Sequence, residues 1–107
     1  MATHAPQNGG DAGAELPDVV PFTLPHLTRL SWELGSRVVG DDESTLHSEW
    51  ERTGSSWLLS IFRVTDNTVI LKVRTPVGRE RFYGAARSDL QTARPRLEDS
   101  PYWHRLE

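Results

Sequence analysis

Residues 56–74, SWLLSIFRVTDNTVILKVR, decide the fold because they hold the densest run of Ile, Val, Leu and Phe in the chain. Two apolar segments flank the sequence TDNT at residues 65–68. Asp and Asn tolerate the positive φ angles that tight hairpin turns require. The stretch therefore predicts a β-hairpin whose two-residue loop is formed by Asp66 and Asn67.

The register of this predicted hairpin follows from its loop. With two loop residues, Val64 lies opposite Val69 and Phe62 lies opposite Leu71. One face then collects the apolar side chains that we expect to form the core, namely Leu58, Phe62, Val64, Val69, Leu71 and Val73. A slip of one residue would scatter this set over both faces, so the pattern itself favours the register.

The opposite side of the predicted sheet, here called the mixed face, combines apolar and basic residues. Its candidate partner-binding residues are Trp57, Ile61, Arg63, Ile70, Lys72, Arg74, Arg81 and Tyr83, and Leu59 lies among them. Such a face is rarely left bare, because removing apolar surface from water is favourable. We expect it to be covered by the chain's own helix, by a second copy or by a foreign partner.

The segments around the hairpin predict an α+β fold, in which a four-stranded antiparallel β-meander is flanked by an N-terminal and a C-terminal helix. Residues 16–94 are expected to form this single domain. Residues 1–15 contain no apolar period and are predicted to be a disordered tail. Residues 95–107 are predicted to be an irregular C-terminal tail, because Pro95 ends the helix before them.

The N-terminal helix is predicted from its start and stop signals. Thr23 and Pro25 are typical of a helix start, and Gly35 is typical of a helix end. Between them lie apolar residues at helical spacing, Leu27, Leu30 and Leu34. The alternation of apolar residues around Trp32 leaves a strand as the alternative.

The remaining elements are read from shorter patterns. Residues 46–52, LHSEWER, alternate like a strand that turns Leu46 and Trp50 onto the core, with a short helix as the alternative. Residues 80–83 predict the last strand after a turn at residues 76–78. Residues 85–93 predict the C-terminal helix, with Leu90 as its main apolar contact.

Composition narrows the possible functions. The chain has 107 residues and no cysteine, which excludes disulfides and thiolate metal sites and is typical of a reducing compartment. No apolar stretch approaches the ~20 residues of a membrane span, so we expect no membrane partner and a cytoplasmic location. Residues 1–62 carry nine acidic and three basic residues, a charge of -6, whereas residues 63–107 carry six acidic and nine basic residues, a charge of +3.

The sequence contains only weak signals for catalytic or metal-binding groups. His47, Ser48 and Glu49 resemble part of a zinc deaminase signature, but the cysteines of that site are missing, so they are interpreted as surface strand residues. The pair Glu49 and Glu51 is interpreted as an exposed edge, and the acidic residues 41–43 as a solvated turn. No nucleophile or nucleotide motif occurs. We therefore expect no enzyme, no metal and no cofactor.

The mixed face supports two hypotheses about function. Its aromatic and Arg content is typical of protein interfaces. This predicts a small regulatory or adaptor module that binds a protein, with a homodimer as one form of that binding. The alternative is single-stranded nucleic acid, with cations on the phosphates and with Trp57 and Tyr83 stacking on bases. The acidic N-terminal half favours the protein partner.

Overall fold

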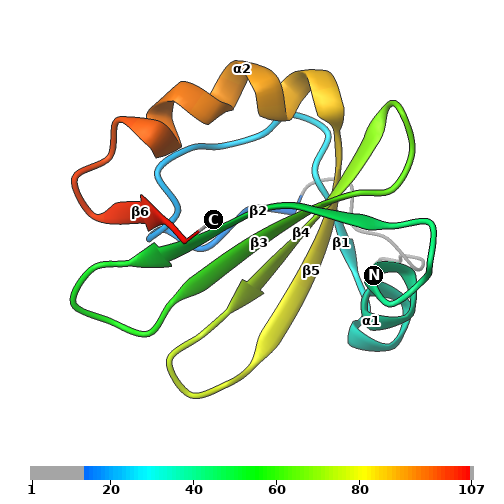
Figure 1. Cartoon of the computed structure of the whole chain (residues 1–107), viewed down its shortest axis with the longest axis horizontal. Coiled ribbons are helices and arrows are strands. Elements are labelled where there is room, and N and C mark those ends of the chain that lie inside the picture. Colours follow the sequence, from blue (N-terminus) through cyan, green and yellow to red (C-terminus); the bar gives the residue numbers. More distant parts are fainter. Residues whose placement is uncertain (1–13, 107) are drawn as a thin grey trace, which may run out of the picture.

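The computed structural model describes residues 14–106 and has an α+β fold with two helices and one antiparallel sheet (Figure 1). Along the chain, the elements are β1 (Thr28–Leu30), α1 (Trp32–Val39), β2 (Thr45–Arg52), β3 (Leu58–Arg63), β4 (Thr68–Arg74), β5 (Glu80–Ala86), α2 (Arg87–Glu98) and β6 (Trp103–Arg105). The sheet has six strands in the order β1-β5-β4-β3-β2-β6, rather than the four predicted. The predicted meander corresponds to β2–β5, and a short strand is added at each edge.

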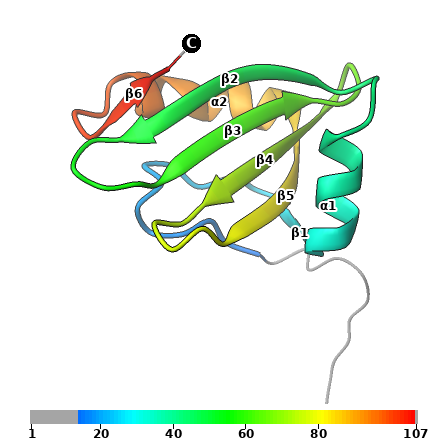
Figure 2. The ribbon, with the colours of Figure 1, turned by 60° about the horizontal axis from the view of Figure 1, so that its bottom comes forward.

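The two helices lie on opposite sides of the sheet. Figure 2 shows α2 behind the sheet and α1 at one end of its front. The side toward α2, here called the helix face, carries the main core, which the segment before β1 also helps to cover. The core residues are Leu16, Val20, Phe22, Leu24, Leu27, Trp50, Leu59, Ile61, Val69, Leu71, Val73, Tyr83, Ala85, Leu90, Ala93, Leu97 and Trp103. Neither helix of residues 14–106 combines the length and apolar character that crossing a bilayer requires.

The hairpin of β3 and β4 is confirmed, but its predicted register is wrong by one residue. Phe62 lies opposite Ile70, and Ile61 lies opposite Leu71. The cause is the turn, in which the backbone N–H of Val64 donates to the carbonyl of Thr68 at 3.0 Å. Arg63 therefore pairs with Val69, so an odd number of residues lies between paired positions where the predicted register has an even number. Because side chains alternate, this change places Ile61 in the core and Phe62 on the other side.

The predicted N-terminal helix over residues 23–35 is not present. His26 has a left-handed φ of 58°, and the chain then enters β1, which pairs with β5. The first helix begins later, after Ser31, whose hydroxyl accepts a hydrogen bond from the Leu34 backbone N–H at 3.2 Å. Gly35 lies inside this helix, because α1 packs so closely on Phe82 of β5 that a side chain would not fit.

Residues 95–106 are ordered, which corrects the prediction of an irregular tail. Pro95 lies inside α2, which continues to Glu98 and buries Leu97 in the core. The chain then returns as β6 along β2. Trp103 is 4% exposed, and its indole N–H donates to the carbonyl of Val19 at 2.9 Å. This pairing joins distant segments, so local sequence does not reveal it. The predicted N-terminal tail falls almost entirely on residues 1–13, outside the described residues.

Strand β2 contains a β-bulge. Leu46 pairs with Phe62 and Ser48 pairs with Ile61, so His47 is an additional residue. Trp50 is buried in the core as predicted, whereas Leu46 is 48% exposed because the bulge moves it to the other side of the sheet. Ser48 lies two residues from Trp50 in the regular part of the strand and faces inward beside it.

Candidate interaction surface

The eight residues predicted for the mixed face do not share one side of the sheet. Directly opposed residues of antiparallel strands point to the same side. Ile70, Lys72 and Arg74 therefore lie on the side away from α2. The remaining members belong to the helix face, namely Trp57, Ile61, Arg63, Arg81 and Tyr83. The predicted surface is thus divided between the two faces. The one-residue change in register moves Ile61 and Arg63 to the helix face, and the pairing of β5 with β4 places Arg81 and Tyr83 there.

Several of these residues are also inaccessible. Ile61 is 2% exposed and Tyr83 is 1% exposed, and both belong to the core. Ile70 is 4% exposed on the other side, and Trp57 packs partly against the core. The predicted residues that remain exposed or half-buried are Trp57 and the four basic ones, Arg63, Lys72, Arg74 and Arg81.

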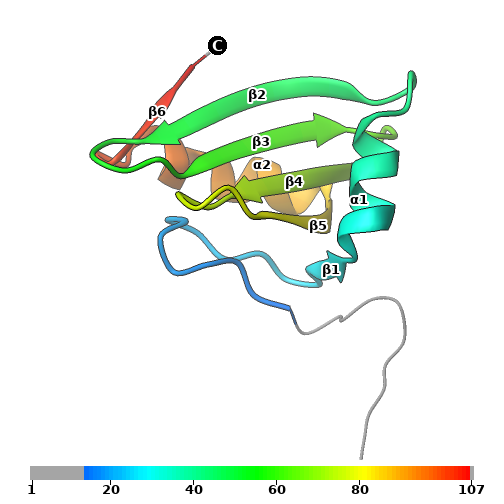
Figure 3. The same cartoon turned by 90° about the horizontal axis from the view of Figure 1, so that it is seen from below.

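The side of the sheet away from α2 has a broad uncovered area. Figure 3 shows α1 across one end of the strands, and no other helix or strand of residues 14–106 lies over this side. We call the uncovered area the open face. Its accessible residues are Leu46, Glu49, Glu51, Leu58, Phe62, Lys72, Arg74 and Glu80, and the fully buried Ser60 lies among them.

The centre of the open face is apolar. Phe62 and Leu58 on β3 are half-buried, and Leu46 lies exposed beside Phe62. Trp32, at the start of α1, is 61% exposed and donates its indole N–H to Glu80 Oε1 at 3.4 Å. This contact holds a large ring at the β5 edge of the open face.

Charges on the open face are sorted by strand. Glu49 and Glu51 lie on β2, and Lys72 and Arg74 lie on β4, with the uncharged β3 residues between them. The Ser60 hydroxyl donates to Glu49 Oε2 at 3.1 Å, and Lys72 Nζ lies 3.6 Å from Glu80 Oε2. The acidic half of the sequence supplies β2 and the basic half supplies β4, so these two strands carry opposite charges on one face, with Glu80 of β5 beside Lys72.

A second surface lies around the turn between β4 and β5. Four arginines line it together with Trp32, Gly78 and Glu80; they are Arg29, Arg74, Arg79 and Arg81. They surround a wide, shallow hollow of about 670 Å³. We call this surface the arginine hollow. Sequence reasoning placed Arg74 and Arg81 on the mixed face but missed Arg29, because only the pairing of β1 with β5 brings it here.

The candidate metal ligands of the sequence are not brought together. Residues 14–106 contain no group of three or more His, Asp or Glu side chains arranged to hold a metal ion. Comparison of the chain with protein-family models, curated proteins and solved structures gave no match. The exposed surfaces of the described residues are therefore the basis for a functional proposal.

Proposed function

We propose that this chain is a non-enzymatic, cytoplasmic protein-interaction module whose partner is a second copy of itself, bound through the open face. The observation that carries the proposal is the arrangement of charge on that face, which is acidic on β2, apolar on β3 and basic on β4. A surface that carries both signs on either side of an apolar strip can be complementary to itself.

The required geometry is a two-fold axis parallel to β3. Such an axis places β2 of one copy over β4 of the other, because it exchanges the two sides of the central strand. Glu49 and Glu51 then face Lys72 and Arg74 of the second copy. An in-plane axis perpendicular to the strands would instead stack acidic β2 on acidic β2. The parallel axis is also compatible with sheets that pack face to face about 10 Å apart.

The size of the open face predicts a weak dimer. Four strands at about 4.8 Å spacing and about six residues at about 3.4 Å each give a footprint of roughly 400 Å². Specific interfaces of standard size bury about 800 Å² per partner. We therefore expect a dimer that exchanges rapidly and is populated only at high protein concentration.

Charge reversal tests this proposal. One variant carries Glu49→Lys with Glu51→Lys, and the other carries Lys72→Glu with Arg74→Glu. Each alone places like charges in contact across the two-fold axis and is expected to be monomeric. An equimolar mixture restores opposite charges and is expected to form a heterodimer. Sedimentation velocity up to millimolar concentration measures these states.

The matched control is Arg96→Glu, which reverses an exposed charge on α2, on the far side of the sheet. It should dimerise like the unmodified chain. Circular dichroism and thermal melting establish that each variant is folded. A folded unmodified chain that stays monomeric, or a mixture of the two variants that fails to pair, would contradict the proposal.

Single-stranded nucleic acid is the second candidate, and the arginine hollow favours it. Four arginines beside the exposed ring of Trp32 could contact phosphates while the ring stacks on a base. One stacked base contributes about 1–3 kcal/mol, so Trp32→Ala should weaken oligonucleotide binding by about tenfold or more. Fluorescence anisotropy at two salt concentrations measures this, and binding that does not weaken with salt would contradict the hypothesis.

A further inference from the structure

A small cleft lies between α2 and the bulged strand β2, on the side of the sheet opposite the open face. It has a volume of about 130 Å³. Ile61, Val69 and Leu90 form its apolar floor, and three arginines line it, namely Arg63, Arg87 and Arg94. The residues that line it include no carboxylate. The cleft is thus a positively charged recess above the hydrophobic core.

Strand β2 supplies the polar wall of the cleft through Ser48 and the bulge residue His47. Ser48 is 3% exposed, which corrects its interpretation as a surface strand residue. Its hydroxyl oxygen accepts the Trp50 indole N–H at 3.1 Å and lies 3.3 Å from His47 Nδ1. An indole only donates, so the serine proton remains to donate to the imidazole or to a ligand. The extra residue of the bulge, His47, also lines the cleft, and bulges are enriched beside functional sites because they redirect side chains.

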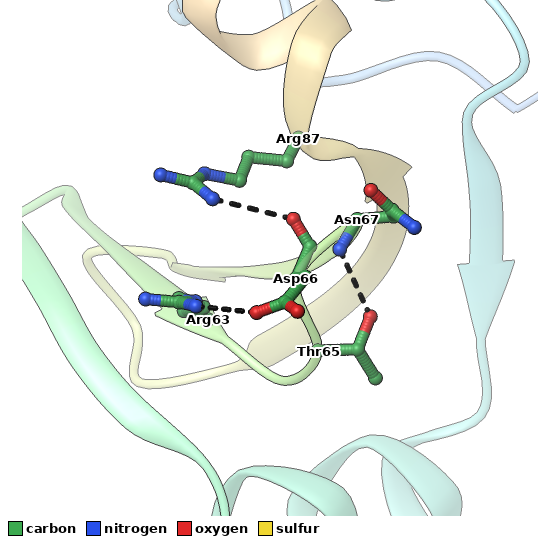
Figure 4. A network of polar contacts seen from close by, with 5 residues as sticks. All are labelled: Arg63, Thr65, Asp66, Asn67 and Arg87. Atoms are coloured by element: carbon green, nitrogen blue, oxygen red, sulfur yellow. Dashed lines mark hydrogen bonds and ion pairs between the residues drawn. The ribbon is translucent and has the colours of Figure 1, made fainter.

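The turn between β3 and β4 brings two of the arginines together. The Arg87 backbone N–H donates to the carbonyl of Asn67 at 2.8 Å, which attaches the start of α2 to the turn. Arg63 Nη2 donates to the carboxylate of Asp66 at 2.6 Å, and Arg87 Nη1 donates to the backbone carbonyl of Asp66 at 3.3 Å (Figure 4). Figure 4 shows both guanidinium groups on the same side of Asp66.

The acidic partners of these arginines do not line the cleft. The Asp66 side chain is 86% exposed, and Arg94 pairs at 3.1 Å with Glu98, whose side chain is 48% exposed. A guanidinium has five N–H donors, so each arginine keeps donors beyond these contacts. The positive charge of the cleft also acts on His47. Partial burial lowers the pKa of its imidazole, and so do the positive charges of the nearby arginines, Arg94, Arg105, Arg87 and Arg63.

We propose that this cleft binds the phosphate group of a small ligand. Arginine forks match phosphate oxygens in pairs, and a doubly charged group compensates the three positive charges better than a single carboxylate does. The volume equals that of about four water molecules, which suits one phosphate group. Drug-sized ligands occupy at least about 300 Å³, so a larger ligand would leave its remainder outside the cleft.

Binding of inorganic phosphate to the ¹⁵N-labelled chain tests the proposal. At constant ionic strength, we expect saturable NMR shifts at the amides of Ser48, Arg63 and Gln91. Arg94→Gln should raise the phosphate Kd about tenfold, because a hydrogen bond to a charged group is lost. The control Arg96→Gln removes the same charge from an exposed position of α2 that does not line the cleft, and it should leave the Kd unchanged.

The imidazole of His47 provides a second readout. A bound dianion offsets the positive charges of the arginines around it, so its pKa should rise when phosphate is present. This change is measured from the His47 ring signals over a pH series, with and without phosphate. A ring pKa that phosphate does not move would place the anion elsewhere and would overturn the proposal.

Three further outcomes would also overturn it. An equal loss of phosphate affinity in Arg94→Gln and Arg96→Gln would mean that the anion is attracted non-specifically. NMR shifts with acetate equal to those with phosphate would show that the cleft does not prefer a phosphate group. Larger shifts of the same amides with an oligonucleotide that lacks a terminal phosphate would assign the cleft to nucleic acid. The variant with Lys72→Glu and Arg74→Glu should bind phosphate normally, so failure of the dimer and failure of the cleft are distinguishable.

Discussion

The tight packing of α1 against Phe82 of β5 supports a sharp prediction at Gly35. A Cβ added there would overlap the ring of Phe82, and even Phe82 Cδ1 would lie only 2.8 Å from it, compared with about 3.5–4.0 Å for normal carbon contacts. Phe82 is 1% exposed and has no room to move away. Gly35→Ala must therefore displace α1 from β5.

The expected cost follows from two opposing effects. Overpacking in a dense core costs about 1–3 kcal/mol, and the better helix propensity of alanine returns about 1 kcal/mol. Because the overlap involves the ring and not a flexible chain end, we take the upper value and expect a net loss of about 2 kcal/mol in the free energy of unfolding. Urea denaturation followed by circular dichroism measures this loss.

A double-mutant cycle identifies the cause. In a Phe82→Ala background the ring is absent, including the Cγ atom that lies nearest to the added Cβ. The added cost of Gly35→Ala should therefore become smaller, with only the contact to the Cβ atom of residue 82 left. Gly40→Ala is the control, because a Cβ there meets only the backbone oxygens of Ser36, at 3.2 Å, and Arg37, at 3.8 Å. A neutral or stabilising Gly35→Ala variant would refute the close packing of α1 on β5.

Three further predictions concern the helix face. Ile61→Ala should lower the free energy of unfolding by about 2–5 kcal/mol in urea titrations, and an unchanged value would exclude it from the core. Trp103→Ala should lower the free energy of unfolding by about 3–5 kcal/mol in the same assay, and an unchanged value would mean that β6 does not stabilise the fold. Because the pKa of His47 is lowered from 6.5 in the fold, the unfolded chain binds its proton more readily. Stability should then fall as the pH drops below about 6.5, and less so in His47→Gln; identical pH profiles would contradict this.

Much of the central sheet could be predicted, because its signals are local. The apolar runs on either side of residues 65–68 correctly indicated β3 and β4, and alternation correctly indicated β2 with Trp50 in the core. The two edge strands could not be found in this way. Strands β1 and β6 have three residues each and exist through pairing with distant partners, β5 and β2.

The candidate surface was predicted less well, because it depends on which side each residue faces. Lys72 and Arg74 are on the open face, but Ile61 and Tyr83 are in the core. The bulge at His47, which moves Leu46 outward, has no distinctive local signal. The sequence does not predict the cleft, because Arg63 and Arg94 are far apart in the chain and come together only when α2 packs on the sheet.

By itself, the sequence determined the class of the fold, the antiparallel hairpin at its centre and the separation of acidic from basic residues along the chain. Only the tertiary structure decided which side chains face the core and which face the solvent. The physical reason is the two-residue period of a strand: the turn pairs Val69 with Arg63 instead of Val64, which shifts the register by one residue and exchanges the faces of β3. That shift places the apolar Phe62 between acidic β2 and basic β4, on the open face.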